Sequence, residues 1–264
     1  MEYTEFSLFT KPWKDMEARD LGKMVHSLGF GGIEFPLREG YQVDLNNMEC
    51  GLLEMANELK KYEVRITSVA AALSEEVFRA CDSADVRLIR VMANFSLEKG
   101  FWEGFKKAGD EIKAAVPLCE KYNVKIGVQH HYGTGIFNSM ELKCFLDSVD
   151  SDYVGAVWDA AHSALSGEDP IQGLDIVWER LKLVNLKTAF YKRTEKEDSS
   201  EFSPCFTTGK HGNTSWEKIV KHLMNKGYKS GICLPAEYTE EEKVLDYIQK
   251  DIRYVQELFS KKHY

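Results

Sequence analysis

The chain has 264 residues, of which 44% are hydrophobic and 29% are charged, and its formal net charge is −8. This composition is typical of a globular protein and provides enough apolar residues for a large core. The acidic balance argues against a general nucleic-acid-binding protein. No stretch approaches the roughly 18 consecutive apolar residues of a membrane span, so we expect no transmembrane helix.

The six cysteines lie far apart in the sequence and form no CxxC pair. This spacing argues against both a secreted disulfide framework and a zinc knuckle. The N-terminal segment lacks the basic and apolar pattern of a signal peptide. We therefore expect a cytoplasmic protein.

Short apolar runs alternate with longer amphipathic stretches along the whole chain. The runs predict eight β-strands, mostly about 30 residues apart, which is the period of a βα unit. Several runs are almost continuously apolar, as strands buried on both faces are. The expected strands are Glu5–Phe9, Gly32–Phe35, Arg65–Ala70, Leu88–Met92, Lys125–Gln129, Tyr153–Trp158, Leu183–Lys187 and Gly231–Ala236.

Helix signals fill the intervals between the expected strands. Apolar residues recur at helical spacing from Leu21 to Leu28, and Gly29 then supplies a C-terminal stop. The segments Thr214–Glu217 and Thr239–Glu242 have the sequence of capping boxes, which predicts that a helix begins at each of them.

Eight βα units in one uninterrupted series favour a single α/β domain, a closed (β/α)8 TIM barrel that covers residues 1–264. Two small domains would also fit the length, but no linker rich in Pro, Gly or Ser divides the chain. An open dinucleotide-binding sheet would require a GxGxxG sequence after a strand, and the chain has none. The longest irregular stretch, residues 191–213, follows the seventh strand, and we expect it to be a lid loop.

Polar side chains stand at the ends of the later strands, where the active sites of (β/α)8 barrels lie. In a closed barrel these side chains converge on one mouth: Gln129, His131, Asp159, His162, Lys187 and Glu237. Carboxylates, imidazoles and one amine suit an oxygen-preferring divalent cation beside a sugar-like substrate. We expect Trp13 to wall the pocket. Arg38 is expected to contact the substrate or to form an ion pair with Glu34 at the rim.

Three segments resemble the xylose-isomerase-like superfamily. Trp158–Ala164 resembles its DxxH motif at strand six, and Gln129–Thr134 and Gly227–Tyr238 are similar to its segments at strands five and eight. The resemblance covers nearly the whole chain. It implies a TIM barrel enzyme of carbohydrate metabolism, because the superfamily includes sugar isomerases, ketose 3-epimerases, inosose dehydratases and endonuclease IV.

The resemblance also implies a metal site at the strand ends. Epimerases of the superfamily place Glu, Asp, His and Glu ligands on strands five to eight, which correspond by position to Gln129, Asp159, Asn185 and Glu237. Gln and Asn carry no charge and cannot act as bases. We therefore expect Gln129, Asp159 and Glu237 to hold Mn²⁺ or Mg²⁺ loosely, with water, Asn185 or His211 completing the shell.

The implied activity is that of a sugar or polyol isomerase or epimerase, or of a related dehydratase. Glu237 or Lys187 would then move the proton as the catalytic residue, and Trp13, Arg38, His131 and His162 would bind the substrate. We expect a small-molecule sugar or polyol as the partner, with no nucleic acid and no membrane, and the sequence leaves a homo-oligomer open.

Two other functions stay open at this stage. The first is a barrel without catalytic activity that binds a small polyol, since Gln129 and Asn185 replace expected metal ligands. The second, least favoured, is a nuclease of the endonuclease IV type, which needs a histidine-rich three-metal cluster. Strands two to four offer no histidine for such a cluster, and the chain is acidic.

Overall fold

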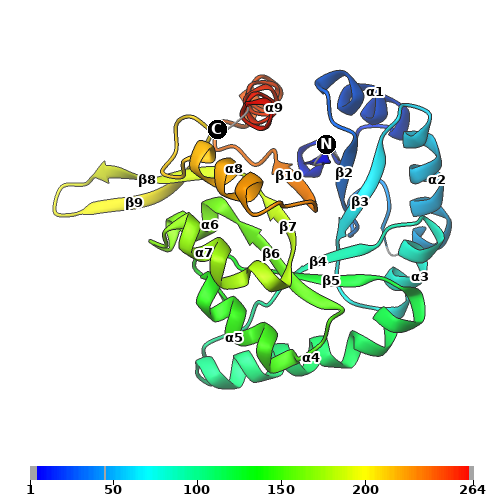
Figure 1. The fold of residues 1–264 in the computed structure, drawn as a ribbon, viewed down its shortest axis with the longest axis horizontal. Coiled ribbons are helices and arrows are strands. Elements are labelled where there is room, and N and C mark those ends of the chain that lie inside the picture. Colours follow the sequence, from blue (N-terminus) through cyan, green and yellow to red (C-terminus); the bar gives the residue numbers. More distant parts are fainter. Residues whose placement is uncertain (1–4, 45, 262–264) are drawn as a thin grey trace.

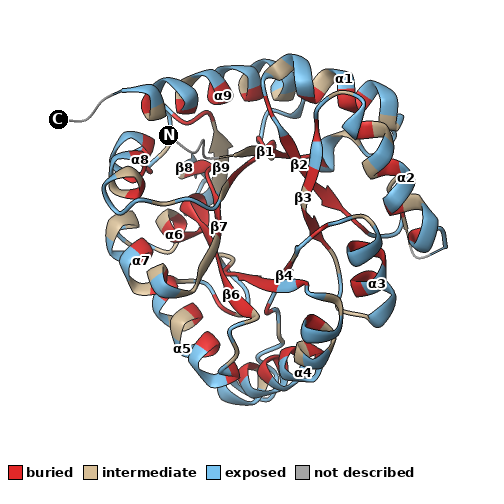
Figure 2. Ribbon diagram, turned by 45° about the vertical axis from the view of Figure 1, so that its right-hand side comes forward, coloured by how far each residue is buried: buried red, intermediate tan, exposed pale blue. Residues whose placement is uncertain are grey.

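Eight short apolar segments form parallel strands that close into a barrel in the order β1-β10-β7-β6-β5-β4-β3-β2 (Figures 1 and 2). The structure is a computed structural model that describes residues 5–44 and 46–261. The barrel strands are β1 (Phe6–Phe9), β2 (Gly32–Pro36), β3 (Arg65–Ala70), β4 (Leu88–Met92), β5 (Lys125–Gln129), β6 (Val154–Asp159), β7 (Leu181–Asn185) and β10 (Gly231–Pro235). The predicted TIM barrel is confirmed, and its strand ends agree with the predicted ends within two residues.

Helices surround the barrel and turn their buried sides toward the strands (Figure 2). They are α1 (Ala18–Leu28), α2 (Met48–Lys60), α3 (Glu75–Ser83), α4 (Phe101–Tyr122), α5 (Ser139–Val149), α6 (Ala160–Leu165), α7 (Pro170–Val177), α8 (Trp216–Asn225) and α9 (Val244–Ser260). Three short 3-10 helices, η1 (Lys11–Trp13), η2 (Trp178–Arg180) and η3 (Glu241–Lys243), lie in the connections. No helix in residues 5–44 or 46–261 is long and apolar enough to cross a membrane.

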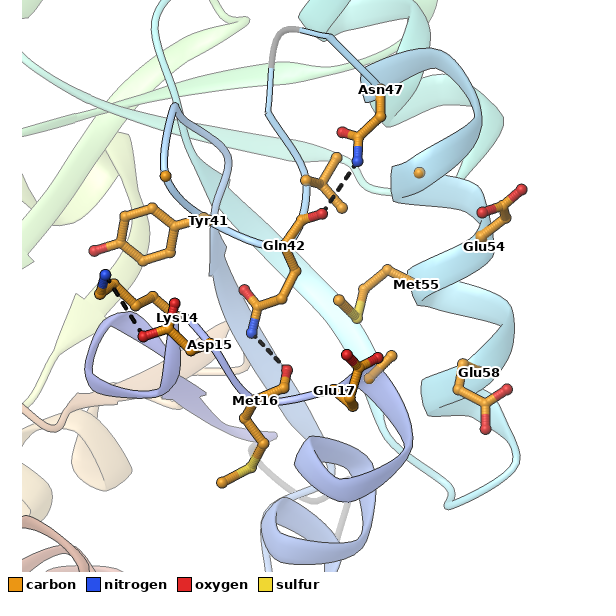
Figure 3. Close-up of a pocket in the computed structure, with 14 residues that line it drawn as sticks. Lys14, Asp15, Met16, Glu17, Tyr41, Gln42, Asn47, Glu54, Met55 and Glu58 are labelled. Carbon is orange, nitrogen blue, oxygen red and sulfur yellow. Dashed lines mark hydrogen bonds and ion pairs between the residues drawn. The ribbon is translucent and has the colours of Figure 1, made fainter.

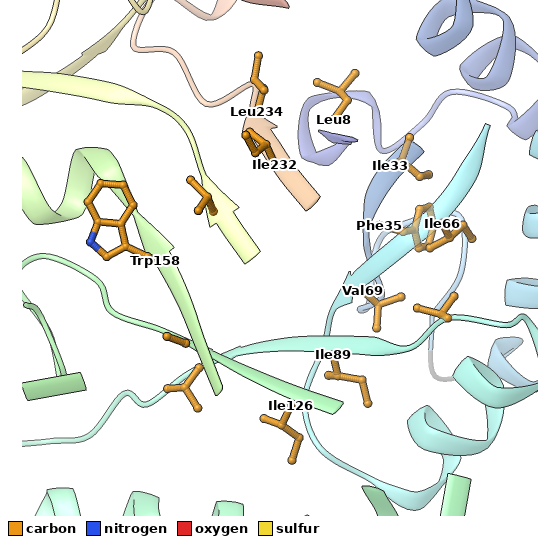
Figure 4. Close-up of a cluster of buried hydrophobic side chains, with 14 of the residues drawn as sticks. Leu8, Ile33, Phe35, Ile66, Val69, Ile89, Ile126, Trp158, Ile232 and Leu234 are labelled. Carbon is orange, nitrogen blue, oxygen red and sulfur yellow. The ribbon is translucent and has the colours of Figure 1, made fainter. Parts of the chain in front are cut away.

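Two layers of apolar side chains hold the barrel together. The larger core contains side chains from strands all around the barrel, among them Phe35, Ile126 and Trp158 (Figure 4). A smaller cluster of Phe9, Ala70, Val157, Leu183 and Cys233 belongs to the barrel strands alone. Burial of these side chains on both faces of the sheet explains why the strands read as continuous apolar runs.

The prediction that residues 191–213 form an irregular loop is wrong, because most of this segment is regular structure, and its role as a lid stays a prediction. Strands β8 (Thr188–Glu195) and β9 (Ser200–Thr207) pair antiparallel and project from the barrel as a hairpin (Figure 1). The base of the hairpin lies near the barrel mouth, since the ring of Phe206 packs against the rings of Tyr132 and His162.

Neither of the two predicted capping boxes forms, because neither Thr214 nor Thr239 caps a helix. Helix α8 is capped by Ser215, whose hydroxyl accepts from the Lys218 N–H, rather than by Thr214. Thr239 caps no helix, because its hydroxyl accepts the N–H of Phe206 in β9, and α9 begins only after η3. Thr239 therefore ties the hairpin to the segment that follows β10.

Candidate functional site

Asp159 connects the fold to the candidate site, because it ends β6 and caps α6. Its Oδ1 accepts the backbone N–H groups of Ala161 and His162, each at 3.0 Å, which is the usual N-cap arrangement. Its Oδ2 lies 2.7 Å from Gln129 Nε2 and 3.4 Å from Lys187 Nζ. One carboxylate oxygen thus fixes the strand-to-helix turn, and the other belongs to the polar cluster.

Lys187 lies between the two carboxylates of the barrel mouth. It follows the end of β7 by two residues, and its Nζ is 3.4 Å from Asp159 Oδ2 and 3.2 Å from Glu237 Oε2. Its side chain is only 8% exposed, and its ammonium lies 5.1 Å from the centre of the Phe206 ring. Burial alone would lower the pKa of Lys187, but the carboxylates of Asp159 and Glu237 outweigh that effect and raise it.

Glu237 follows the end of β10 and reaches the solvent side of the cluster. Its Oε1 accepts from Lys11 Nζ at 2.6 Å, while its Oε2 contacts Lys187, and its side chain is 28% exposed. Burial would raise the pKa of Glu237, but the charges of Lys187 and Lys11 prevail and lower it well below its ordinary value. Glu237 is therefore a carboxylate at neutral pH.

A buried ion pair beneath the mouth was missed by the sequence analysis. Arg90 in β4 donates from Nε to Glu34 Oε1 at 2.7 Å and from Nη1 to Gln129 Oε1 at 2.5 Å. Glu34 is fully buried in β2 and also accepts from the Ser68 hydroxyl. The prediction that Glu34 pairs with Arg38 at the rim is wrong, because Glu34 faces the barrel interior with Arg90.

These residues form one continuous chain of contacts across the barrel. The order of contacts is Glu34, Arg90, Gln129, Asp159, Lys187, Glu237 and Lys11. Three carboxylates therefore alternate with three cations, and their formal charges cancel. Gln129 joins the two halves, since its Oε1 accepts from Arg90 and its Nε2 donates to Asp159.

Two histidines lie beside this chain. The ring centres of His131 and His162 are 4.0 Å apart, and His162 Nε2 is 3.6 Å from Asp159 Oδ2. Burial lowers the pKa of both imidazoles, and the charge of Lys187 lowers them further, so both are neutral at neutral pH. Buried His162 Nδ1 and Asn185 Oδ1 have no hydrogen-bond partner within the described part of the chain, which is uncommon for buried polar atoms.

The structure does not bring every predicted residue into this cluster. Trp13 packs against the hydrophobic core, and its carbonyl accepts from Gln42 Nε2, so neither contact joins it to the mouth. His211 is exposed and lies 2.6 Å from the Thr208 hydroxyl, beside a surface cavity that α9 borders, so His211 does not complete a metal shell. Arg38 does lie near the mouth, because it shares a cavity of about 160 Å³ with Arg90.

A larger cavity of about 540 Å³ lies elsewhere, between the segment that joins η1 to α1, the loop of residues 40–43 and the side of α2 (Figure 3). Its acidic wall is formed by Asp15, Glu17, Glu54 and Glu58. It contains no member of the chain of contacts described above. The convergence of charges at the strand ends, rather than cavity size, is therefore the basis for the candidate site.

The family model described as "Xylose isomerase-like TIM barrel" matches residues 23–258.

The chain belongs to the xylose isomerase-like TIM barrel family. It is 28% identical over 142 residues to an inosose dehydratase from Bacillus cereus, an alignment that covers 51% of this chain and 48% of that protein. The chain thus spans about half the length of the curated relatives it matches. The structure is similar to D-psicose 3-epimerase from Clostridium cellulolyticum H10, with a TM-score of 0.73, 11% identity, and coverage of 98% of this chain and 100% of the other.

A third similar protein, a xylose isomerase-like TIM barrel protein from Mycobacterium smegmatis, was solved in complex with magnesium. Its TM-score is 0.72 at 14% identity, with 97% of each chain covered. That protein binds magnesium, which raises the question of whether the oxygens of the site in this chain fit a divalent metal.

The predicted metal ligands Gln129, Asp159 and Glu237 do come together, but their oxygens already face cations or N–H groups. Asp159 Oδ2 faces Gln129 Nε2 and Lys187 Nζ, and Gln129 Oε1 accepts from Arg90. Both oxygens of Glu237 contact lysine ammonium groups. Among residues 5–44 and 46–261 no group of three or more His, Cys, Asp or Glu side chains could hold a metal ion. In this arrangement the donor set does not fit a divalent cation.

Proposed function

We propose that this chain catalyses proton transfer at a carbon next to the carbonyl group of a small polyhydroxylated compound, a sugar or a cyclitol. Two similar proteins are named as an inosose dehydratase and a ketose 3-epimerase. Dehydration of an inosose and 3-epimerisation of a ketose both begin with removal of such a proton. The observation that carries the proposal is the Lys187 ammonium held between the carboxylates of Asp159 and Glu237 at the mouth of the barrel.

The two groups that contact each other there have complementary roles in this chemistry. Loss of the proton places negative charge on the carbonyl oxygen, and a fixed ammonium such as that of Lys187 stabilises this charge. The Glu237 carboxylate is ionised and partly exposed, so we assign it the role of general base, although the two lysines that lower its pKa also weaken it as a base. Gln129 cannot take that role, because an amide has no basic oxygen at neutral pH.

The remaining polar groups suit the hydroxyl groups of such a substrate. The unpartnered Oδ1 of Asn185 is a hydrogen-bond acceptor. The unpartnered Nδ1 of His162 accepts or donates a hydrogen bond, depending on the tautomer of the imidazole. The neutral ring of His131 lies beside that of His162, tilted by 41°, and is partly buried. We assign His131, His162 and Arg38 to substrate binding. Trp13 has no contact that supports this role.

Exchange of substrate hydrogen with solvent tests the proposal. Purified protein is incubated in D₂O with a panel of ketoses and inososes, and ¹H NMR follows loss of the signal from the carbon next to the carbonyl. We expect exchange with at least one compound, and a loss of rate of at least about 100-fold in Glu237→Gln and in Lys187→Met.

Lys14→Met is the matched control, because Lys14 pairs with Asp15 outside the cluster, and this variant should exchange at the wild-type rate. Exchange that survives in both Glu237→Gln and Lys187→Met would contradict the assigned roles. The appearance of an alkene signal distinguishes a dehydratase from an epimerase in the same spectra.

A second candidate function is a polyol-binding barrel without catalytic activity. It is favoured by the position of Gln129, which is held from both sides by Arg90 and Asp159 and provides no second base. Saturable chemical-shift changes of a polyol without any deuterium incorporation would support this function over the first.

A further inference from the structure

The cation between Asp159 and Glu237 is part of the chain itself. Lys187 Nζ is 3.4 Å from Asp159 Oδ2 and 3.2 Å from Glu237 Oε2, so one ammonium contacts both anionic residues of the predicted metal site. We propose that the Lys187 ammonium takes the place of a divalent cation, so that this chain is a metal-independent member of its family.

The charge balance of the cluster supports this inference. The carboxylates of Glu34, Asp159 and Glu237 are matched one for one by Arg90, Lys187 and Lys11. A divalent ion would add two positive charges beside the buried Lys187 ammonium, and like charges at this distance repel strongly in a poorly solvated site.

The third predicted ligand is also unavailable. The carbonyl oxygen of Gln129 accepts a short hydrogen bond from Arg90, and Arg90 is itself held by Glu34. Rotation of the Gln129 amide toward a metal would leave a buried guanidinium N–H without its partner, which is costly. The site therefore resists a metal at Gln129 as well as between the two carboxylates.

The inference does not depend on the proposed reaction, because a metal titration tests the inference and deuterium exchange tests the reaction. The probe is Mn²⁺ alone, titrated into protein that has been dialysed against EDTA, with free Mn²⁺ measured by electron paramagnetic resonance. For the wild-type chain we expect no binding tighter than about 1 mM, which is the weak end of protein sites for divalent cations.

Lys187→Ala should create a metal site, because it frees one oxygen of Asp159 and one of Glu237 and removes the repelling charge. We expect this variant to bind Mn²⁺ at least about 100-fold more tightly than the wild type. Lys11→Ala is the matched control, since it removes the other lysine of Glu237 but leaves Lys187 in place, and it should bind no better than the wild type. Lys187→Arg keeps the charge and should also show no gain.

Wild-type protein that binds Mn²⁺ in the micromolar range, and loses it in Asp159→Asn, would overturn the inference. Equal affinity of Lys187→Ala and Lys11→Ala would overturn it as well. Circular dichroism checks that Lys187→Ala folds. If it does not, Lys187→Gln, which keeps a polar side chain of similar reach, is titrated in its place with the same expected gain, and the wild-type titration still decides.

Discussion

Removal of Arg90 should destabilise the barrel more than removal of any exposed cation. Glu34 is fully buried and Arg90 nearly so, and their closest atoms are 2.7 Å apart. Burial lowers the pKa of Arg90, but the charge and the hydrogen bond of Glu34, together with smaller contributions such as the charge of Glu237, outweigh burial and raise it. Two unit charges about 4 Å apart attract by about 4 kcal/mol at an effective dielectric constant of 20.

Arg90→Met leaves the Glu34 carboxylate buried without its cation and the Gln129 carbonyl without its donor. We expect a loss of about 3–5 kcal/mol in the free energy of unfolding, measured by urea denaturation at pH 7. The double variant Arg90→Met/Glu34→Gln removes both charges and should be more stable than Arg90→Met alone, so the coupling energy in the cycle should exceed about 1.5 kcal/mol.

The exposed pair of Arg87 and Asp82 provides the matched control. Its closest atoms are also 2.7 Å apart, but the two side chains are 44% and 48% exposed. The cycle of Arg87→Met and Asp82→Asn should give a coupling energy below about 1 kcal/mol. Equal coupling in the two cycles would refute the argument that burial makes the Arg90 pair important.

Two further predictions concern the backbone and the pH dependence of stability. Gly135→Ala should lower the free energy of unfolding by more than about 3 kcal/mol, because a Cβ there would lie 2.1 Å from the Ala93 carbonyl oxygen. Gly133 has a similar positive φ but open space around it, so Gly133→Ala should lower the free energy of unfolding by only about 1–2 kcal/mol. Thermal unfolding compares the two variants, and equal losses would contradict the steric argument. Burial raises the pKa of Asp251 from 3.8 to about 6. The stability that protonated Asp251 contributes is therefore fully present below about pH 4 and is lost as the pH rises through about 6, which lowers the free energy of unfolding by roughly 3 kcal/mol. Asp251→Asn should flatten the urea midpoint between pH 4 and pH 7, and an unchanged slope would show that Asp251 is not the titrating group.

The barrel could be predicted from the sequence because each buried strand is a short apolar run followed by a helix. The site was predictable where a polar residue directly follows such a run, as Asp159 and Glu237 do. Arg90 and Glu34 were missed as a pair although each is the one charge within an apolar strand, since pairing of residues from β2 and β4 depends on the closed barrel. The contacts of Lys187 with Asp159 and Glu237 could not be predicted, because a sequence does not show which carboxylates an ammonium will contact.

The hairpin was missed for a different reason. Most of β8 is exposed and carries charged residues, and β9 mixes polar with apolar residues and is only partly buried, so neither has the apolar run that marked the barrel strands. Thr239 was misread as a helix cap because its contact with Phe206 joins segments that lie 33 residues apart. Local patterns predict local caps, and a long-range partner of this kind overrides them.

The proposal that Lys187 takes the place of a metal is tested most directly by anomalous diffraction from crystals of the wild-type protein soaked in Mn²⁺. The structure predicts no anomalous peak between Asp159 and Glu237, with Lys187 Nζ in electron density between their carboxylates. A manganese peak at about 2–2.5 Å from oxygens of both residues, with Lys187 displaced, would contradict it.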